Sequence, residues 1–70
     1  MRKQYFKYYY LANTLIASAW TVKLFNRSGE FICDEFDNYF TDHREELYER
    51  NVYYISIKKD INEIHVMFTD

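Results

Sequence analysis

Alternating apolar and polar residues predict β-strands over much of the chain. From Trp20 to Leu24 the even positions are apolar and the odd positions, Thr21 and Lys23, are polar, which is the period of a strand with one buried face. The run ends at residues 26–29, which include the only glycine of the chain, and apolar residues resume two positions later. Two such runs around a turn-forming group predict a β-hairpin.

Strand character is also present near both ends of the chain. Residues 4–11 are rich in aromatic side chains that favour strands, so we expect a first strand there. Residues 52–58 and 63–68 flank the turn-forming residues 59–62 and predict a second hairpin. Residues 12–19 fit a continuation of the first strand, a turn or a short helical turn.

A period of about 3.6 residues replaces the alternation after Cys33 and predicts an amphipathic helix over about residues 35–50. Asp34 suits the N-cap position and Asn51 the position that follows the helix. The apolar stripe of this helix comprises Phe36, Tyr39, Phe40, His43, Leu47 and Tyr48.

These elements predict an α+β fold in the order β-β-β-α-β-β. We expect a small antiparallel sheet of four or five strands with the helix packed on one face. The opposite face would then carry the surplus tyrosines, which suit interfaces because they are apolar at one end and polar at the other.

Length and composition indicate a single domain, residues 1–70, with a dense core. Of the 70 residues, 49% are hydrophobic and 21% are aromatic, which excludes a disordered chain. A core of this size needs further stabilisation, yet the single Cys33 excludes an internal disulfide and no Cys/His cluster offers a metal site. We therefore expect no metal and no cofactor, and self-association as the further source of stability.

The compartment expected for the chain is the cytoplasm. A lone cysteine fits a reducing environment. The apolar stretch at residues 11–20 is interrupted by polar residues and is too short to span a bilayer. The N-terminus lacks the apolar run of a signal peptide.

Charge is unevenly distributed along the chain. Residues 1–29 hold five cations and no acid, whereas residues 30–49 hold eight acids and one cation, Arg44. One interpretation is the ordinary charged outer face of a surface helix. The other is a functional surface, because carboxylates on a rigid helix can imitate the charges of a nucleic-acid backbone and occupy a basic groove. The partner-binding residues predicted on this basis are Asp37, Asp42, Glu45, Glu46 and Glu49.

Cations alternate with aromatic residues near the N-terminus, where Arg2, Lys3 and Lys7 accompany several tyrosines. This combination can grip single-stranded nucleic acid, although an edge strand protected by lysines has the same composition. The sequence pI of about 5.6 argues against a dedicated nucleic-acid binder. The predicted aromatic interface comprises Tyr5, Tyr8, Tyr9 and Tyr10. We expect Trp20, Tyr53 and Tyr54 to serve in core or inter-strand packing.

No catalytic centre is predicted. Cys33 and His43 are the nucleophile and base considered as a pair, and along the expected helix they would be too far apart for a hydrogen bond. Glu45 and Glu46 are adjacent on a helix and point in different directions. Phosphate-binding motifs need several glycines. We therefore expect a protein that is not an enzyme.

The segment from Trp20 to Lys59 combines a hairpin, an acidic helix and a return strand. In this order and charge it is similar to small phage inhibitors of DNA-processing enzymes, including the uracil-DNA glycosylase inhibitor type. The resemblance implies a phage or mobile-element protein in the host cytoplasm that blocks a host nucleic-acid-processing enzyme or defence complex. The alternatives are a single-stranded nucleic-acid binder and a homo-oligomeric assembly protein.

Overall fold

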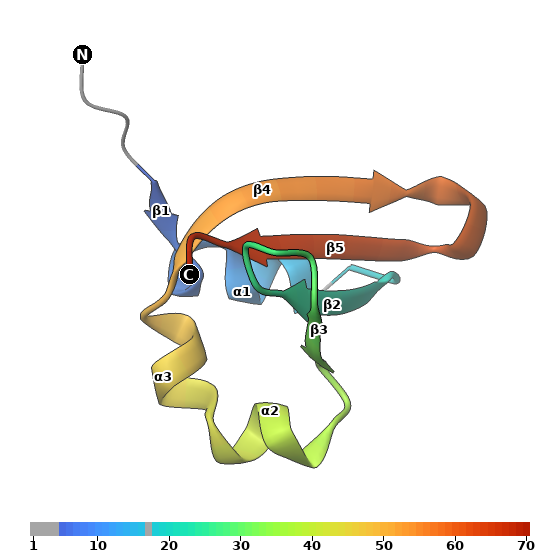
Figure 1. Cartoon of the computed structure of the whole chain (residues 1–70). Coiled ribbons are helices and arrows are strands. Elements are labelled where there is room, and N and C mark those ends of the chain that lie inside the picture. The colour runs from blue at the N-terminus through green and yellow to red at the C-terminus, as the bar shows by residue number, and fades with distance from the viewer. Residues whose placement is uncertain (1–4, 17) are drawn as a thin grey trace.

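A computed structural model describes residues 5–16 and 18–70 of the chain (Figure 1). The five strands form one sheet in the spatial order β1-β4-β5-β2-β3, and this confirms the predicted α+β class and the five strand regions. The elements along the chain are β1 (Phe6–Lys7), α1 (Tyr9–Ile16), β2 (Thr21–Phe25), β3 (Phe31–Asp34), α2 (Asn38–Asp42), α3 (Arg44–Tyr48), β4 (Asn51–Lys58), the 3-10 turn η1 (Lys59–Ile61) and β5 (Glu63–Phe68).

Both predicted hairpins are confirmed. Strands β2 and β3 are antiparallel, and in their turn the side-chain oxygen of Asn26 accepts a 2.9 Å hydrogen bond from the backbone N–H of Glu30. Gly29 in this turn has φ +89°, a conformation that glycine adopts without strain. Strands β4 and β5 are also antiparallel, and Asn62 closes their turn in the left-handed conformation.

The two hairpins join through a parallel pair, so the antiparallel sheet that was expected is mixed, with every other strand pair antiparallel. Strand β5 lies between β4 and β2, and it runs parallel to β2 from Thr21↔Glu63 to Phe25↔Met67. The chain between β3 and β4 passes through α2 and α3, outside the sheet (Figure 1). Alternation within a strand says which face is buried but nothing about the direction of a distant neighbour.

The predicted first strand is shorter than expected and its second half is helix. Strand β1 contains only two residues, and α1 begins at Tyr9, because the buried Tyr8 and Ala12 and the half-buried Leu11 and Leu15 recur at helical spacing. Packing of this stripe overrides the strand preference of the tyrosines. Residue 17 and the predicted strand start at residue 4 lie outside the described residues.

The single helix predicted over residues 35–50 is two short helices instead. They meet at His43, whose φ of −117° and ψ of 22° are not helical. The three residues 41–43 are all poor helix formers, and the break allows both Phe40 and Leu47 to reach the core. The other aromatic residues of the predicted apolar stripe do not all reach the core. Tyr48 packs against the core, whereas Phe36 is 76% exposed and Tyr39 is 44% exposed.

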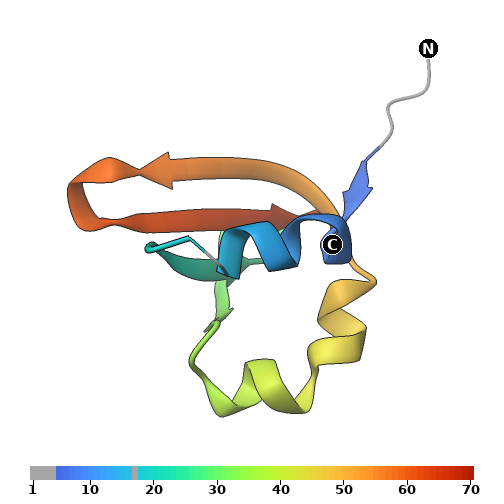
Figure 2. The same cartoon turned by 180° about the vertical axis from the view of Figure 1, so that it is seen from behind.

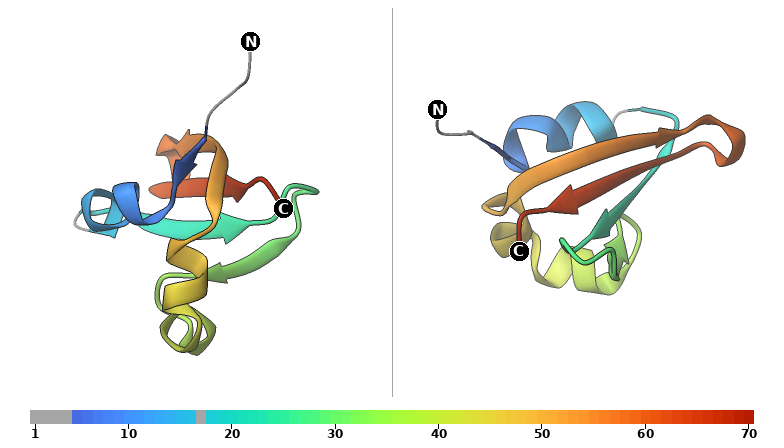
Figure 3. Two further views of the ribbon diagram at one scale, coloured as in Figure 1. Left: turned by 90° about the vertical axis from the view of Figure 1, so that its left-hand side faces the viewer. Right: turned by 45° about the horizontal axis from the view of Figure 1, so that its top comes forward.

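The core lies on one face of the sheet. In Figure 2, α1 crosses in front of β5 and β2, and Figure 3 shows the same layer from the edge, with α2 and α3 beyond β3. All three α-helices contribute to one cluster. Its buried members are Tyr8, Ala12, Val22, Leu24, Cys33, Phe40, Leu47, Val52, Ile64, Val66 and Phe68.

Candidate interaction surfaces

Three of the five predicted partner-binding acids surround one concavity at the junction of α2 and α3. Asp42 ends α2, and Glu45 and Glu46 lie in the first turn of α3; all three are exposed. The other lining residues are Thr41, His43 and Arg44. Arg44 is the only cation of this lining, and its guanidinium lies 6.0 Å from the centroid of the Phe40 ring. We call Asp42, Glu45 and Glu46 the acidic surface.

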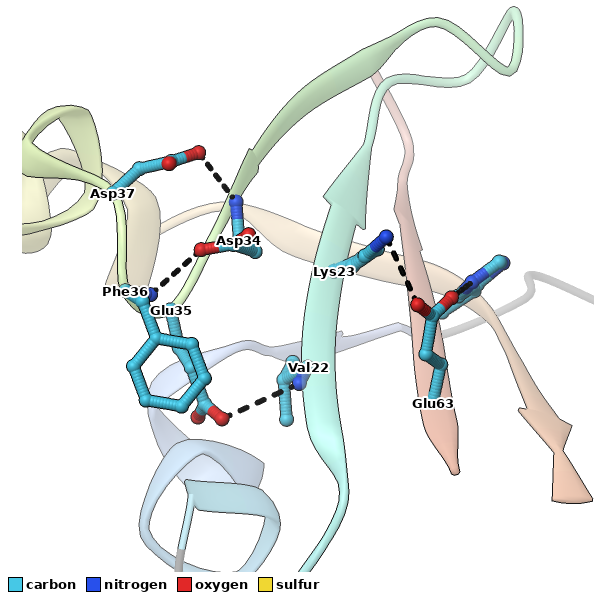
Figure 4. Close-up of polar contacts among 8 residues, drawn as sticks. Val22, Lys23, Asp34, Glu35, Phe36, Asp37 and Glu63 are labelled. Atoms are coloured by element: carbon cyan, nitrogen blue, oxygen red, sulfur yellow. Dashed lines mark hydrogen bonds and ion pairs between the residues drawn. The ribbon is translucent and has the colours of Figure 1, made fainter. Parts of the chain in front are cut away.

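The other two predicted acids are engaged within the chain. The Oδ2 of Asp37 accepts a 2.9 Å hydrogen bond from the backbone N–H of Asp34, whose Oδ1 accepts one of 2.8 Å from the backbone N–H of Phe36 (Figure 4). Asp37 occupies the N-cap position of α2, so the assignment of Asp34 to that position was wrong. Glu49 pairs with Lys7 at 2.7 Å and raises the pKa of that lysine.

The four N-terminal tyrosines do not form one surface. Tyr8 is fully buried and makes edge-to-face contacts with Tyr48 and Phe68. The rings of Tyr9 and Tyr10 are 4.3 Å apart at the start of α1, where both are exposed. Tyr5 instead contacts Tyr53 at a ring distance of 6.3 Å. Arg2 and Lys3 of the predicted basic arm lie outside the described residues.

Sequence reasoning missed an apolar groove beside β1 and β4. The register of β4 shifts between Val52 and Tyr54, and the two consecutive tyrosines, Tyr53 and Tyr54, are both at the surface. A register shift of this kind cannot be predicted from the alternation of apolar and polar residues along the strand. Phe6 is 69% exposed and Tyr54 is 56% exposed. The groove is lined by Tyr5, Phe6, Leu11, Val52, Tyr53, Tyr54 and Ile55.

The sheet face opposite the core carries a polar cluster that sequence reasoning also missed. Glu63 Oε2 lies 2.9 Å from Lys23 Nζ (Figure 4). Glu63 Oε1 lies 2.8 Å from His65 Nε2. The rings of His65 and Phe25 are 4.8 Å apart. These residues are neighbours only because β2 and β5 are paired.

Cys33 and His43 occupy unrelated environments. Cys33 is buried in the core, and burial, together with Asp37 and Asp34, raises the pKa of its thiol to about 11. The ring of His43 stacks on Tyr39 at 3.9 Å, with Nδ1 3.0 Å from the carbonyl oxygen of Tyr39. A thiol with a raised pKa is a poor nucleophile at neutral pH.

Within residues 5–16 and 18–70, no three His, Cys, Asp or Glu side chains form a group that could hold a metal ion. The helices of this described part are all too short or too polar to cross a membrane. No protein-family model, curated protein or solved structure matches the chain.

Proposed function

We propose that the protein is a small binding domain that docks its acidic surface into a basic groove of another protein. The partner class we infer is a host nucleic-acid-processing enzyme or defence complex, which the chain inhibits as a product of a phage or mobile element. One observation carries the proposal: Asp42, Glu45 and Glu46 are exposed around a single concavity in which Arg44 is the only cation.

Anchoring of the two short helices favours this role for the acidic surface. Phe40 packs α2 and Leu47 packs α3 against the same core. The helix backbones that carry the three carboxylates are therefore already fixed, and they lose little conformational freedom on binding. A net negative charge around a concavity concentrates the local potential and steers a positively charged partner. A groove that accepts the phosphates of nucleic acid has the complementary charge.

The test compares two double charge reversals that change the net charge equally. Glu45→Lys/Glu46→Lys alters the acidic surface, whereas Glu30→Lys/Asp60→Lys alters exposed acids in the two hairpin turns. Each immobilised protein is exposed to lysate, retained proteins are identified and purified, and binding is measured with and without competing double-stranded DNA. We expect the wild type and the hairpin variant to bind, DNA to compete, and the acidic-surface variant to lose binding.

Two results would overturn the proposal. One is retention of full affinity by Glu45→Lys/Glu46→Lys in a protein whose circular dichroism melt matches that of the wild type. The other is binding that added double-stranded DNA does not reduce, because a partner that uses a nucleic-acid groove must be competed by its natural occupant.

Self-association is a second candidate function, favoured by the apolar groove beside β1 and β4. An exposed Phe6 next to Tyr54 is a costly arrangement for a monomer, and aromatic residues with polar ends are common in interfaces. Sedimentation equilibrium over a range of concentrations tests this function. A dimer that is lost in Tyr54→Lys and retained in Tyr10→Lys, a variant of an exposed tyrosine on α1, would support it; a monomer at all concentrations would refute it.

A further inference from the structure

A small pocket lies between the segment that links α1 to β2 and the residues that follow β3. Its volume is about 210 Å³, which is below the range of about 300–1,000 Å³ for drug-sized ligands but sufficient for the end of one side chain. We call it the Trp20 pocket. The lining residues are Ser18, Ala19, Trp20, Thr21, Glu35 and Phe36.

The carboxyl group of Glu35 is incompletely satisfied. Its Oε1 accepts only a long hydrogen bond of 3.5 Å from the backbone N–H of Val22 (Figure 4). Its Oε2 is buried and has no hydrogen-bond partner among the described residues. Burial raises the pKa of Glu35, and the neighbouring charge that acts in the same direction is another acid, Asp34. A carboxylate in such a place lacks the positive group that would offset its desolvation.

Two aromatic side chains complete the pocket. Trp20 is half-buried and packs against the core, so its position is supported from behind. Phe36 follows Glu35 directly and is largely exposed, held at its backbone N–H by the carboxylate of Asp34. The faces of aromatic rings attract cations, and tryptophan does so most strongly.

We propose that the Trp20 pocket binds the positively charged end of a partner's arginine or lysine side chain. The carboxyl group supplies the opposite charge and the rings supply cation–π contacts, so both kinds of lining favour the same ligand chemistry. An anion would meet the negative charge of Glu35 and Asp34, and a neutral group would gain nothing from that charge. The pocket shares no lining residue with the concavity of the acidic surface, so this inference does not depend on the proposed function.

The chain contains a single tryptophan, so fluorescence reports on the pocket directly. The full protein is titrated with N-acetyl-arginine amide, with N-acetyl-lysine amide and with the neutral isostere N-acetyl-citrulline amide at constant ionic strength. We expect a saturable change in Trp20 emission with at least one of the two cations and none with the citrulline compound. The cationic compound with the lower dissociation constant identifies the preferred head group, guanidinium or ammonium.

Two variants test the assignment of the residues. Glu35→Gln keeps an acceptor for Val22 but removes the charge, and we expect it to weaken binding by about tenfold or more, as for loss of a charged partner. Phe36→Ala changes an exposed side chain, so it should fold normally and bind more weakly. Phe31→Ala, an exposed phenylalanine at the other end of β3, serves as the matched control and should bind as the wild type does.

The proposal is overturned by an equal response to citrulline, by a response that does not saturate, or by wild-type affinity in Phe36→Ala. The last result decides the matter even where Glu35→Gln fails to fold. Loss of partner binding in the acidic-surface variant is a separate outcome, because that variant leaves the Trp20 pocket unchanged and should still bind the cation.

Discussion

Lys23 and Glu63 form an ion pair across the parallel strands β2 and β5, with Nζ 2.9 Å from Oε2. Glu63 also bonds His65, and the hydrogen bond from His65, followed by that from Lys23, lowers the pKa of Glu63. The pair therefore links the two hairpins on the sheet face opposite the core.

The contribution of ionised Glu63 to stability should disappear in acid. Because its folded pKa lies below the ordinary value of 4.5, the stabilisation is complete above about pH 4.5 and is lost as the pH falls through the folded pKa. We expect Glu63→Gln to melt at a lower temperature than the wild type at neutral pH, with a difference that shrinks below pH 4.5. Glu45→Gln, on the surface of α3, is the control; a difference for Glu63→Gln that does not change with pH would contradict the prediction.

Phe40 and Phe36 should differ sharply in their effect on stability. Phe40 is only 2% exposed and belongs to the core, so Phe40→Ala should lower the free energy of unfolding by about 3–5 kcal/mol. Phe36→Ala should change it by no more than about 0.5 kcal/mol, because the side chain is largely exposed. Urea unfolding followed by circular dichroism measures both, and similar losses in the two variants would place Phe36 in the core.

Removal of the Tyr8 hydroxyl should not destabilise the protein. The ring is fully buried, but its hydroxyl oxygen has no hydrogen-bond partner in the described part of the chain. A buried, unpaired hydroxyl costs about 1–3 kcal/mol of desolvation, so Tyr8→Phe should leave the free energy of unfolding unchanged or raise it by about 1 kcal/mol. Tyr8→Ala, by contrast, should cost about 3–5 kcal/mol. A clear loss in Tyr8→Phe would reveal a partner for the hydroxyl.

Cys33 should react slowly in the folded protein. Raising its thiol pKa from 9.0 to about 11 reduces the thiolate fraction near neutral pH by about a hundredfold, and burial blocks access as well. Alkylation by iodoacetamide, followed by mass spectrometry, should be slow in native buffer and rapid in denaturant. Equal rates in the two conditions would show that the core around Cys33 opens readily.

The strand regions and both hairpins could be predicted because their signals are local. Alternation from Trp20 to Leu24 and the turn at Gly29 identify the first hairpin without reference to the rest of the chain. The helix at residues 9–16 was expected only in part, as the short helical turn that was one of three alternatives for residues 12–19. Its first residues were assigned to a strand although Tyr8, Leu11, Ala12 and Leu15 have helical spacing, because tyrosine-rich segments also favour strands.

The placement of the candidate interaction surfaces could be predicted less completely. Charge along the chain identified Asp42, Glu45 and Glu46, and these three lie together. It could not distinguish them from Asp37 and Glu49, whose carboxylates are engaged with Asp34 and Lys7. The Trp20 pocket had no sequence signal, since its two sides come from segments about fifteen residues apart.

The sequence alone was enough to predict the four strands of the two hairpins, the positions of both hairpin turns and the stretch that carries the negative charge. These properties depend on neighbours within a few positions, where backbone preference and periodicity act. Long-range packing, by contrast, sets β2 and β5 parallel, breaks the acidic segment at His43 and buries Tyr8 while Phe36 stays exposed. Those outcomes depend on which distant apolar groups share one small core, and packing energy there exceeds the modest preferences of single residues.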